Sequence, residues 1–556
     1  MNRKSFLTPF KNKRTSVTMS IPSSANRPKG TLTPYSGEWT QKEAKHLLRA
    51  TMFGPKKIEV DTFSPLGMNL SVAKILNPLP VIVPPISIST TQGDIENLPW
   101  HLSNAKVNNF NRKKSLKAWM LSNMIHQEAS IGEKMLLFWH NHFVTGMDSV
   151  DDARFTYYYL KLLRQYSLGN VKTLTKKIST NAAMLKYLSG DSNVKGSPNE
   201  NYARELMELF TIGAVDKDGN PNYIEKDVEE AARVLTGWKT IKSGNGTVLS
   251  PHSTFDANKH DYQPKQFSAH FKNKIIHRVL PTDYQKELDD LIDMIFAREE
   301  TALFIVRQVY AWFVHYDIDA FTEQNIITPL AKQLRDGNYE IKPVLETLLK
   351  SQHFYDQFAR GTSVKTPADY VVGSIRQLEV NLPLNFPIES YHLLYKIDEH
   401  LRDMQMDILN PPNVAGWSAF YQSPGYYQIW INTATYQVRS EFGQTLLKNG
   451  IYSPTQRFKA DLPKFLNLVT NLQASDINVV IDSCCELLFP LDITANQKQY
   501  LKEILLQGLP DFEWTIEWTQ FTLANIQPDS PSGYAMRKKL EDFFIEIFNM
   551  AEYHLN

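Results

Sequence analysis

TALFIVRQVYAWFVHY (residues 301–316) is apolar on nearly every face of the helix that it predicts. Such a helix is expected in the middle of a large bundle, where neighbouring helices cover all of its sides. Helical spacing also dominates elsewhere, as in SLKAWMLSNMIHQ (115–127), where Leu116, Trp119 and Met124 share one face. Further helices are predicted at about 285–297, 323–335, 341–353, 367–380, 430–447, 461–473, 475–488, 494–507 and 536–551.

Strands are scarce in this sequence. The best candidate is a short hairpin near residues 239–256, with GNG at 244–246 as its turn. The predicted fold class is therefore all-α, a large multi-helix bundle with a short β-hairpin insertion. The 556 residues are enough for roughly two to four domains. We expect a disordered basic tail (1–39), a main helical domain (40–451) and a C-terminal helical extension (452–556).

The composition disfavours several classes of partner. Sixty Lys and Arg residues nearly balance 59 Asp and Glu residues, so nothing in the overall charge favours nucleic acid as a partner. No apolar run approaches the ~18 residues of a membrane helix, and no integral membrane segment is expected. The opening MNRKSFL is similar to the start of an export signal, but the apolar run that should follow is missing. The only cysteines, Cys484 and Cys485, are adjacent and form no disulfide framework.

The sequence also lacks several common catalytic patterns. It contains no GxSxG elbow, GxxxxGK phosphate loop, HExxH pair or dinucleotide-binding glycine pattern. The common serine hydrolases, nucleotide hydrolases and zincins are therefore disfavoured.

The densest polar cluster is SPNENYARELMELFTIG, residues 197–213. On the predicted helix Glu200, Arg204 and Glu208 form one line, and Glu205 lies on a second line beside it. An arginine between carboxylates is typical of an ion-pair ladder that fixes a helix in place. The alternative is a site in which Glu205 or Glu208 acts as a metal ligand or general base.

A second cluster, FWHNHF (138–143), contains His140 and His142. Histidines two residues apart diverge on a regular helix but can converge at a helix end, and Thr-Gly after the block predicts an end near residue 143. One hypothesis is a divalent metal bound by His140, His142 and Glu205. The other is a pair of hydrogen-bonded core histidines.

A third cluster, HDYQPKQF (260–267), follows the predicted hairpin. His260, Asp261 and Lys265 are a plausible acid–base or anion-binding set, and a solvated loop is the alternative. Two glycine-containing turns, LTGW and PPNVAGW, carry tryptophans that either stack on a sugar ring or fill the core. Over all these motifs, the candidate catalytic residues are His140, His142, Glu205, Glu208, His260 and Asp261. The candidate substrate-binding residues are Asn141, Asn199, Asn201, Arg204, Lys265, Asn413, Trp238 and Trp417.

Several of these blocks resemble a bacterial family known as "domain of unknown function 1800". The resemblance spans about residues 40–445, and in the first block Ala50 follows Arg49 where the family often has a second arginine. The blocks, in chain order, are HLLRATMFG (46–54), LFWHNHFVT (137–145), NAAMLKYLSG (181–190), SPNENYARELMELFTIG (197–213), EKDVEEAARVLTGW (225–238), KTPADYVV (365–372), DILNPPNVAGW (407–417) and WINTATYQVR (430–439).

The resemblance implies a mostly helical bacterial protein that is often exported, and a sulfatase-like functional partner of the "domain of unknown function 1501" family. It implies no particular reaction. Two hypotheses about function follow. In the first the protein is a hydrolase or transferase, metal-assisted or not, that acts on a cell-envelope polymer. In the second it is a non-catalytic helical partner or scaffold for a sulfatase-like protein or a glycan.

Overall fold

The computed structural model of this chain describes residues 27–80, 82–88, 94–103, 109–242, 250–277, 283–382, 387–420, 426–453, 457–526 and 530–556. These residues are mostly helical, and their strands form only small two-stranded sheets. The all-α fold class is therefore confirmed.

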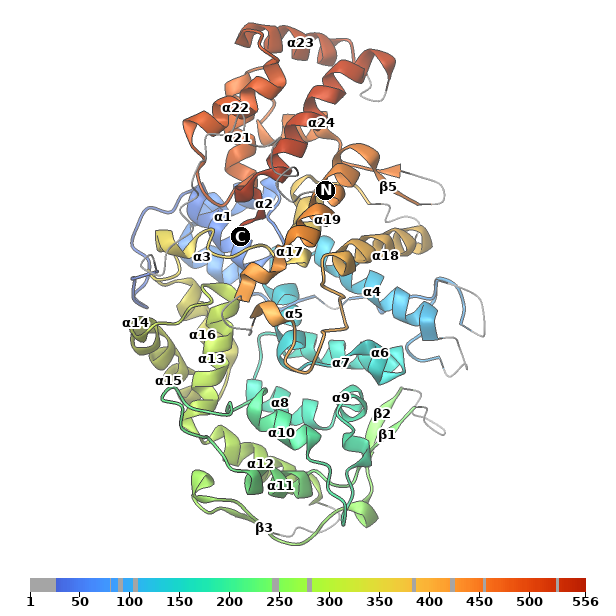
Figure 1. The fold of residues 1–556 in the computed structure, drawn as a ribbon, viewed down its shortest axis with the longest axis vertical. Helices are drawn as coiled ribbons and strands as arrows, with labels where there is room; N and C mark the ends of the chain where they lie inside the picture. Colours follow the sequence, from blue (N-terminus) through green and yellow to red (C-terminus); the bar gives the residue numbers. More distant parts are fainter. Residues whose placement is uncertain are drawn as a thin grey trace, which may run out of the picture.

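The molecule is elongated, with helices from different parts of the chain meeting at its middle (Figure 1). The N-terminal helices are α1 (Gln41–Thr51), α2 (Lys57–Phe63), α3 (Gly67–Ile75) and α4 (Asn109–Ile125). The next helices are α5 (Gly132–His142), α6 (Met147–Val150), α7 (Ala153–Gln165), α8 (Val171–Ser179), α9 (Ala182–Tyr187), α10 (Asn201–Glu208) and α11 (Glu225–Val234). Short strands follow as β1 (Trp238–Ile241), β2 (His252–Phe255), β3 (Lys265–Gln266) and β4 (Ile275–Ile276).

The second half of the chain is again helical, and its last helices form one end of the molecule (Figure 1). Its first helices are α12 (Gln285–Phe296), α13 (Glu299–Phe313), α14 (Ala320–Thr322), α15 (Thr328–Asp336), α16 (Ile341–Leu349), α17 (Pro367–Gln377), α18 (Pro387–Asp403) and α19 (Thr433–Gln444). The strands β5 (Ile451–Tyr452) and β6 (Arg457–Phe458) precede α20 (Leu462–Val469), α21 (Ile477–Leu488), α22 (Ala495–Leu506), α23 (Asp511–Leu523) and α24 (Tyr534–Asn549).

Helix α13 corresponds to the apolar stretch 301–316. One side of it is in the core, where Ile305, Val309 and Tyr310 are buried. Gln308, Ala311 and Trp312 are instead partly exposed. The helix is therefore not covered on every side, and its partly open side forms a cavity wall described below.

The predicted hairpin is confirmed. Strand β1 pairs antiparallel with β2, with Trp238 opposite Phe255, while the predicted turn at 244–246 lies outside the described residues. Strands β3 and β4 form a second small antiparallel pair, and β5 and β6 a third. Neither of these two pairs was predicted.

Both ends of the described chain pack against the main body. Arg27 lies 3.2 Å from the Asp319 carboxylate, and the Tyr35 amide donates to the Lys350 carbonyl at 2.8 Å, so residues 27–39 run along the body. At the other end, the Lys365 amide donates to the His554 carbonyl at 2.7 Å. Among the described residues, no helix is long and apolar enough to cross a membrane.

Candidate functional site

The two histidines of α5 have different partners. His140 is fully buried, and its Nδ1 lies 3.1 Å from the Tyr159 hydroxyl. His142 is the last residue of α5, as the helix end predicted near residue 143 requires, and its Nε2 lies 2.9 Å from the Phe210 carbonyl oxygen. Burial lowers the pKa of His140 to about 3 and that of His142 to about 4, so both rings are neutral at neutral pH.

The neutral state of His142 fixes its tautomer. A carbonyl oxygen can only accept a hydrogen bond, so the proton is on Nε2 and Nδ1 is left as an acceptor. No hydrogen bond to Nδ1 is found among the described residues.

Asn141, between the histidines, holds the turn of the PPNVAGW block against the end of α5. Its Oδ1 accepts from the Trp417 amide at 2.9 Å. The Trp417 ring is buried and lies edge-on to His140, with 5.9 Å between ring centroids. Asn413 stabilises the same turn, because its Oδ1 accepts from the Ala415 amide at 2.9 Å.

The acidic line on α10 is largely an ion-pair cluster at the surface. Arg204 lies 3.0 Å from one carboxylate oxygen of Glu225 and 3.1 Å from Glu200, and about a third of its side chain is exposed. The Tyr223 hydroxyl lies 3.4 Å from Glu208. Glu205 is half-buried, and burial, followed by repulsion from Glu208, raises its pKa.

Asn199, before α10, forms a hydrogen bond with the backbone. Asn199 accepts from the Asn201 amide at 3.0 Å through Oδ1, which forms the turn into the helix, and Asn201 itself is exposed. Among the described residues, no group of three or more His, Cys, Asp or Glu side chains is arranged to hold a metal ion. The candidate ligands His140, His142 and Glu205 therefore do not form such a group.

The third cluster is a buried charge network beside β3. His260 Nδ1 lies 2.8 Å from the Thr236 carbonyl oxygen, and its Nε2 lies 3.3 Å from Glu287. The Lys265 ammonium forms an ion pair with the same Glu287 carboxylate, and both side chains are almost fully buried. Asp261 is paired with Arg233 at 2.8 Å. Glu287 could not be assigned to this cluster from the sequence, because it lies on α12, some 20 residues from the motif.

The network is far from the histidines of α5. Strand β3, which carries Lys265, lies at one end of the molecule, whereas α5 lies near its middle (Figure 1). Trp238 is 6% exposed and packs against Phe255 and Tyr284, with centroid distances of 5.5 Å. It fills the core beside the hairpin.

Two adjoining cavities form what we call the central cleft, and a third pocket adjoins the second of them. The first, the His142 cavity, has a volume of about 90 Å³ and contains Asn141 and His142 in its wall. The second, the Asp369 cavity, shares the wall residues Ala311, Trp312 and Phe420 with the first. The third, the Arg49 pocket, has a volume of about 230 Å³ and shares His46, Arg49 and Asn556 with the second.

The Asp369 cavity combines aromatic walls with a buried ion pair. Thr366 caps α17 and positions Asp369 in the first turn, with Thr366 Oγ1 2.9 Å from a carboxylate oxygen. The other carboxylate oxygen is paired with the Lys134 ammonium from α5. The aromatic residues in the wall include Trp312, Tyr316, Phe420, Tyr427 and Trp430.

The rings of the cleft include one stacked pair and several edge-on pairs, such as Phe420 with Trp430 and Tyr316 with Tyr427. Trp312 and Phe420 stack with 4.2 Å between centroids. The indole Nε1 of Trp430 is buried and has no hydrogen-bond partner among the described residues. An unpaired buried donor is costly, and a ligand hydroxyl or a water molecule in the cavity would satisfy it.

The cleft unites blocks that are far apart in the sequence. Its walls come from 46–50, 137–142, 308–316, 362–369 and 414–430, apart from residues that lie outside the described ranges. Of the predicted site residues, the cleft contains only Asn141 and His142. Arg49 and the KTPAD block have no predicted role in the sequence, because their convergence depends on how the helices pack.

Comparisons with known proteins give a family match. A family model described as "Protein of unknown function (DUF1800)" matches residues 46–525, which is most of the chain. No curated protein and no solved structure matches the chain significantly. The match runs beyond residue 439, where the last recognised block ends, and includes α20–α23. The chain therefore belongs to the DUF1800 family of proteins of unknown function.

Proposed function

We propose that the protein binds a segment of a hydroxyl-rich polymer, such as a cell-envelope glycan, in the central cleft. The observation that carries this proposal is the set of aromatic rings around the Lys134–Asp369 pair. Trp312, Tyr316 and Tyr427 line the Asp369 cavity and are partly exposed, so part of each ring can contact a ligand. Aromatic faces stack on sugar rings, while a few fixed polar groups orient the hydroxyls.

The cleft also has polar groups along its length. Asn141 and Gln308 line the His142 cavity, and Thr366 and His315 line the Asp369 cavity. Binding sites for small ligands and polymers combine such groups with apolar walls. The arrangement supports ligand binding at several points along the cleft.

Trp312 provides the test, because it lies in the wall of both cavities. Binding would be measured by co-sedimentation with peptidoglycan sacculi and by calorimetry with neutral and acidic oligosaccharides. We expect Trp312→Ala to weaken binding by about 1–3 kcal/mol, the range for loss of an aromatic stacking contact. Phe512→Ala, on the exposed side of α23, is the matched control and should bind as the wild type does. Equal binding by Trp312→Ala and the wild type would contradict the proposal.

A hydrolase or transferase is the second candidate function, and His142 favours it. Its ring lines the cleft, and because Nε2 is bound to the Phe210 carbonyl, Nδ1 is the nitrogen left to accept a proton from water or a sugar hydroxyl, as a weak base with a pKa of about 4. Sacculi or oligosaccharides incubated with the protein would be analysed for released or transferred fragments. His142→Gln should abolish product release, whereas His140→Gln, which changes a ring outside the wall, should retain it. Unchanged activity in His142→Gln would rule out this role.

Family membership adds a partner and a location to the proposal. We propose export to the cell envelope and association with a sulfatase-like protein of the "domain of unknown function 1501" family. Co-purification of the two tagged proteins tests the association. A partner bound equally by the wild type and by Trp312→Ala would show that it docks outside the cleft.

A further inference from the structure

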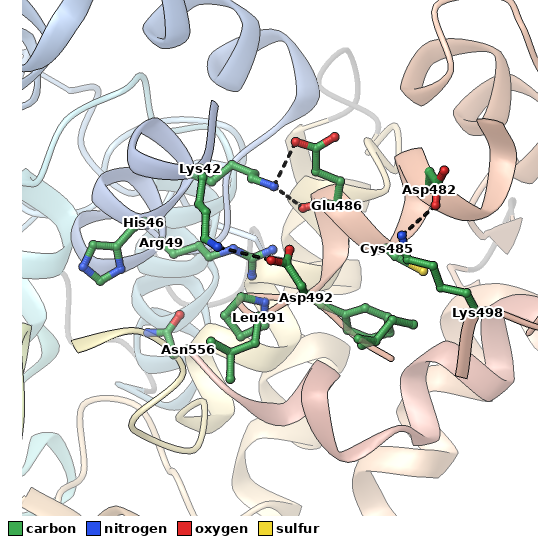
Figure 2. A pocket seen from close by; sticks show the side chains of 14 residues that line it. Lys42, His46, Arg49, Asp482, Cys485, Glu486, Leu491, Asp492, Lys498 and Asn556 are labelled. Carbon is green, nitrogen blue, oxygen red and sulfur yellow. Dashed lines mark hydrogen bonds and ion pairs between the residues drawn. The ribbon is translucent and has the colours of Figure 1, made fainter. Parts of the chain in front are cut away.

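The Arg49 pocket lies between helix α1 and the C-terminal helices α21 and α22 (Figure 2). Lys42, Lys45, His46 and Arg49 project into it from α1. Its opposite wall is formed by α21, by the segment 489–493 and by the first turn of α22. The pocket is therefore formed by two parts of the chain that are more than 400 residues apart in sequence.

The acidic residues of the pocket are already paired with lysines. Lys42 lies 3.2 Å from Asp492, Lys45 lies 3.4 Å from Glu486, and Lys498 lies 2.7 Å from Asp482. Each pair is internally neutral. None of these carboxylates is left over to neutralise another cation.

Arg49 is the additional cation. It is 3% exposed, and no carboxylate among the described residues lies within ion-pairing distance of it. Its Nη2 donates to the Leu487 carbonyl, while Nε is buried without a hydrogen-bond partner. A buried guanidinium without a counter-ion is costly, because charge is strongly disfavoured in a low-dielectric environment unless it is paired.

Two more buried basic side chains lie outside the pocket wall, Lys365 near Arg49 and Arg439 near Lys365. The Lys365 ammonium is 4.0 Å from the centroid of the Tyr553 ring, and the Arg439 guanidinium is 5.0 Å from the centroid of Tyr370. Both are almost fully buried, and neither has an ion pair among the described residues. Asp369 is the carboxylate that attracts both, and it is already paired with Lys134.

The pKa of Lys365 reflects its position near Arg49. Burial, followed by repulsion from Arg49, holds the pKa of Lys365 well below its usual value. Burial also lowers the pKa of Arg49 to about 10. Arg49 thus remains a buried guanidinium without an ion pair among the described residues.

We infer that the Arg49 pocket binds an oxyanion, namely a carboxylate, phosphate or sulfate group, through the Arg49 guanidinium. Arginine presents N–H donors in a fork that matches such groups. The volume of about 230 Å³ accommodates a group of this size. The anion could be free in solution or a substituent of a polymer in the adjoining Asp369 cavity, and only the second source rests on the proposed function.

The test uses the full-length chain and defined anions. Thermal unfolding and calorimetry would be followed during titration with inorganic phosphate, sulfate and glucuronate, each against sodium chloride at equal ionic strength. The variants are Arg49→Met, which removes the buried charge, and Lys332→Met, a control that removes a positive charge outside the pocket. Lys332 is 68% exposed and paired with Asp336, so its loss leaves the pocket unchanged.

We expect a saturable rise in melting temperature for the wild type and Lys332→Met, and no saturable rise for Arg49→Met. Phosphate and sulfate stabilise proteins in general, so an equal rise in Arg49→Met would overturn the inference. The absence of saturable binding by any of the three anions in the wild type would overturn it as well. Binding of glucuronate but not of phosphate or sulfate would support the inference and identify a carboxylated sugar as the ligand class.

A second variant protects the test against misfolding of Arg49→Met. Arg49→Lys keeps the positive charge but loses the fork, so we expect anion affinity to fall by about tenfold while the fold is kept. Unchanged affinity in Arg49→Lys would contradict a direct contact with Arg49. The glycan experiment with Trp312→Ala is independent of these anions, so failure of either proposal can be recognised separately.

Discussion

Gly416 shows how a single residue places the PPNVAGW turn against α5. Its φ is +92°, and a Cβ at this position would lie 2.8 Å from the Asn141 carbonyl oxygen and would also clash with Asn141 Oδ1. The backbone can therefore approach Asn141 only because glycine has no side chain. This close approach brings Trp417 and the neighbouring wall of the cleft into position.

We expect Gly416→Ala to lower the free energy of unfolding by about 2–4 kcal/mol, because it adds a steric clash to backbone strain. Gly508→Ala is the matched control, since Gly508 has a φ of +85° and nothing within 4 Å of the added Cβ. It should cost only about 1 kcal/mol. Chemical denaturation would measure both. Equal losses would show that the contact with Asn141 does not matter.

The buried carboxylate of Glu287 is ionised because of its neighbours His260 and Lys265. Burial would raise the pKa of its carboxyl, but hydrogen bonds from His260 and Lys265 outweigh that effect and lower the pKa. The pair therefore stabilises the fold above the ordinary pKa of a glutamate, and this contribution is lost as the pH falls through the folded-state pKa.

Glu287→Gln should lower the free energy of unfolding by about 3 kcal/mol at pH 7, because Lys265 is left buried without its counter-ion. The difference from the wild type should shrink as the pH falls through the lowered folded-state pKa of Glu287. Urea denaturation at several pH values would measure it. A difference that does not change with pH would contradict the ionised pair.

At the scale of elements, helical periodicity predicted most of the helices but not the side that each turns to the cleft. The helices at 285–297, 475–488 and 494–507 match α12, α21 and α22 within a few residues. Helices α18 and α23 were not anticipated. The open side of α13 could not be predicted, because it depends on where Phe420 and its neighbours lie after the chain folds back.

The last short helix, Ala551–His554, packs against α17, and this contact can be tested. The 3₁₀ turn Ala551–His554 places Tyr553 fully inside the protein, where its hydroxyl lies 2.7 Å from Ser374 Oγ. We expect Tyr553→Ala to lower the free energy of unfolding by about 3–5 kcal/mol, as for other large-to-small core substitutions. Tyr452→Ala, at a residue that is 64% exposed, should change it by less than about 0.5 kcal/mol. Comparable losses in the two variants would mean that this turn is not docked.

At the scale of the whole molecule, the net charge is close to zero, but the charges are unevenly distributed. Sixty basic and 59 acidic side chains almost cancel, yet Arg49, Lys365 and Arg439 are buried together with little compensation. Composition could not reveal this, because it depends on which helices meet. The same is true of the candidate site, where sequence patterns identified Asn141 and His142 but not the aromatic walls around Asp369. The boundary between residues 451 and 452 stays a prediction.

The measurement that tests the central cleft most directly is hydrogen–deuterium exchange of the full-length protein with and without soluble peptidoglycan fragments. We expect slower exchange in peptides from α13, from the turn at 411–417 and from the N-terminus of α17, and no change in α23. Protection confined to other surfaces, or no protection at a saturating fragment concentration, would contradict ligand binding in the cleft.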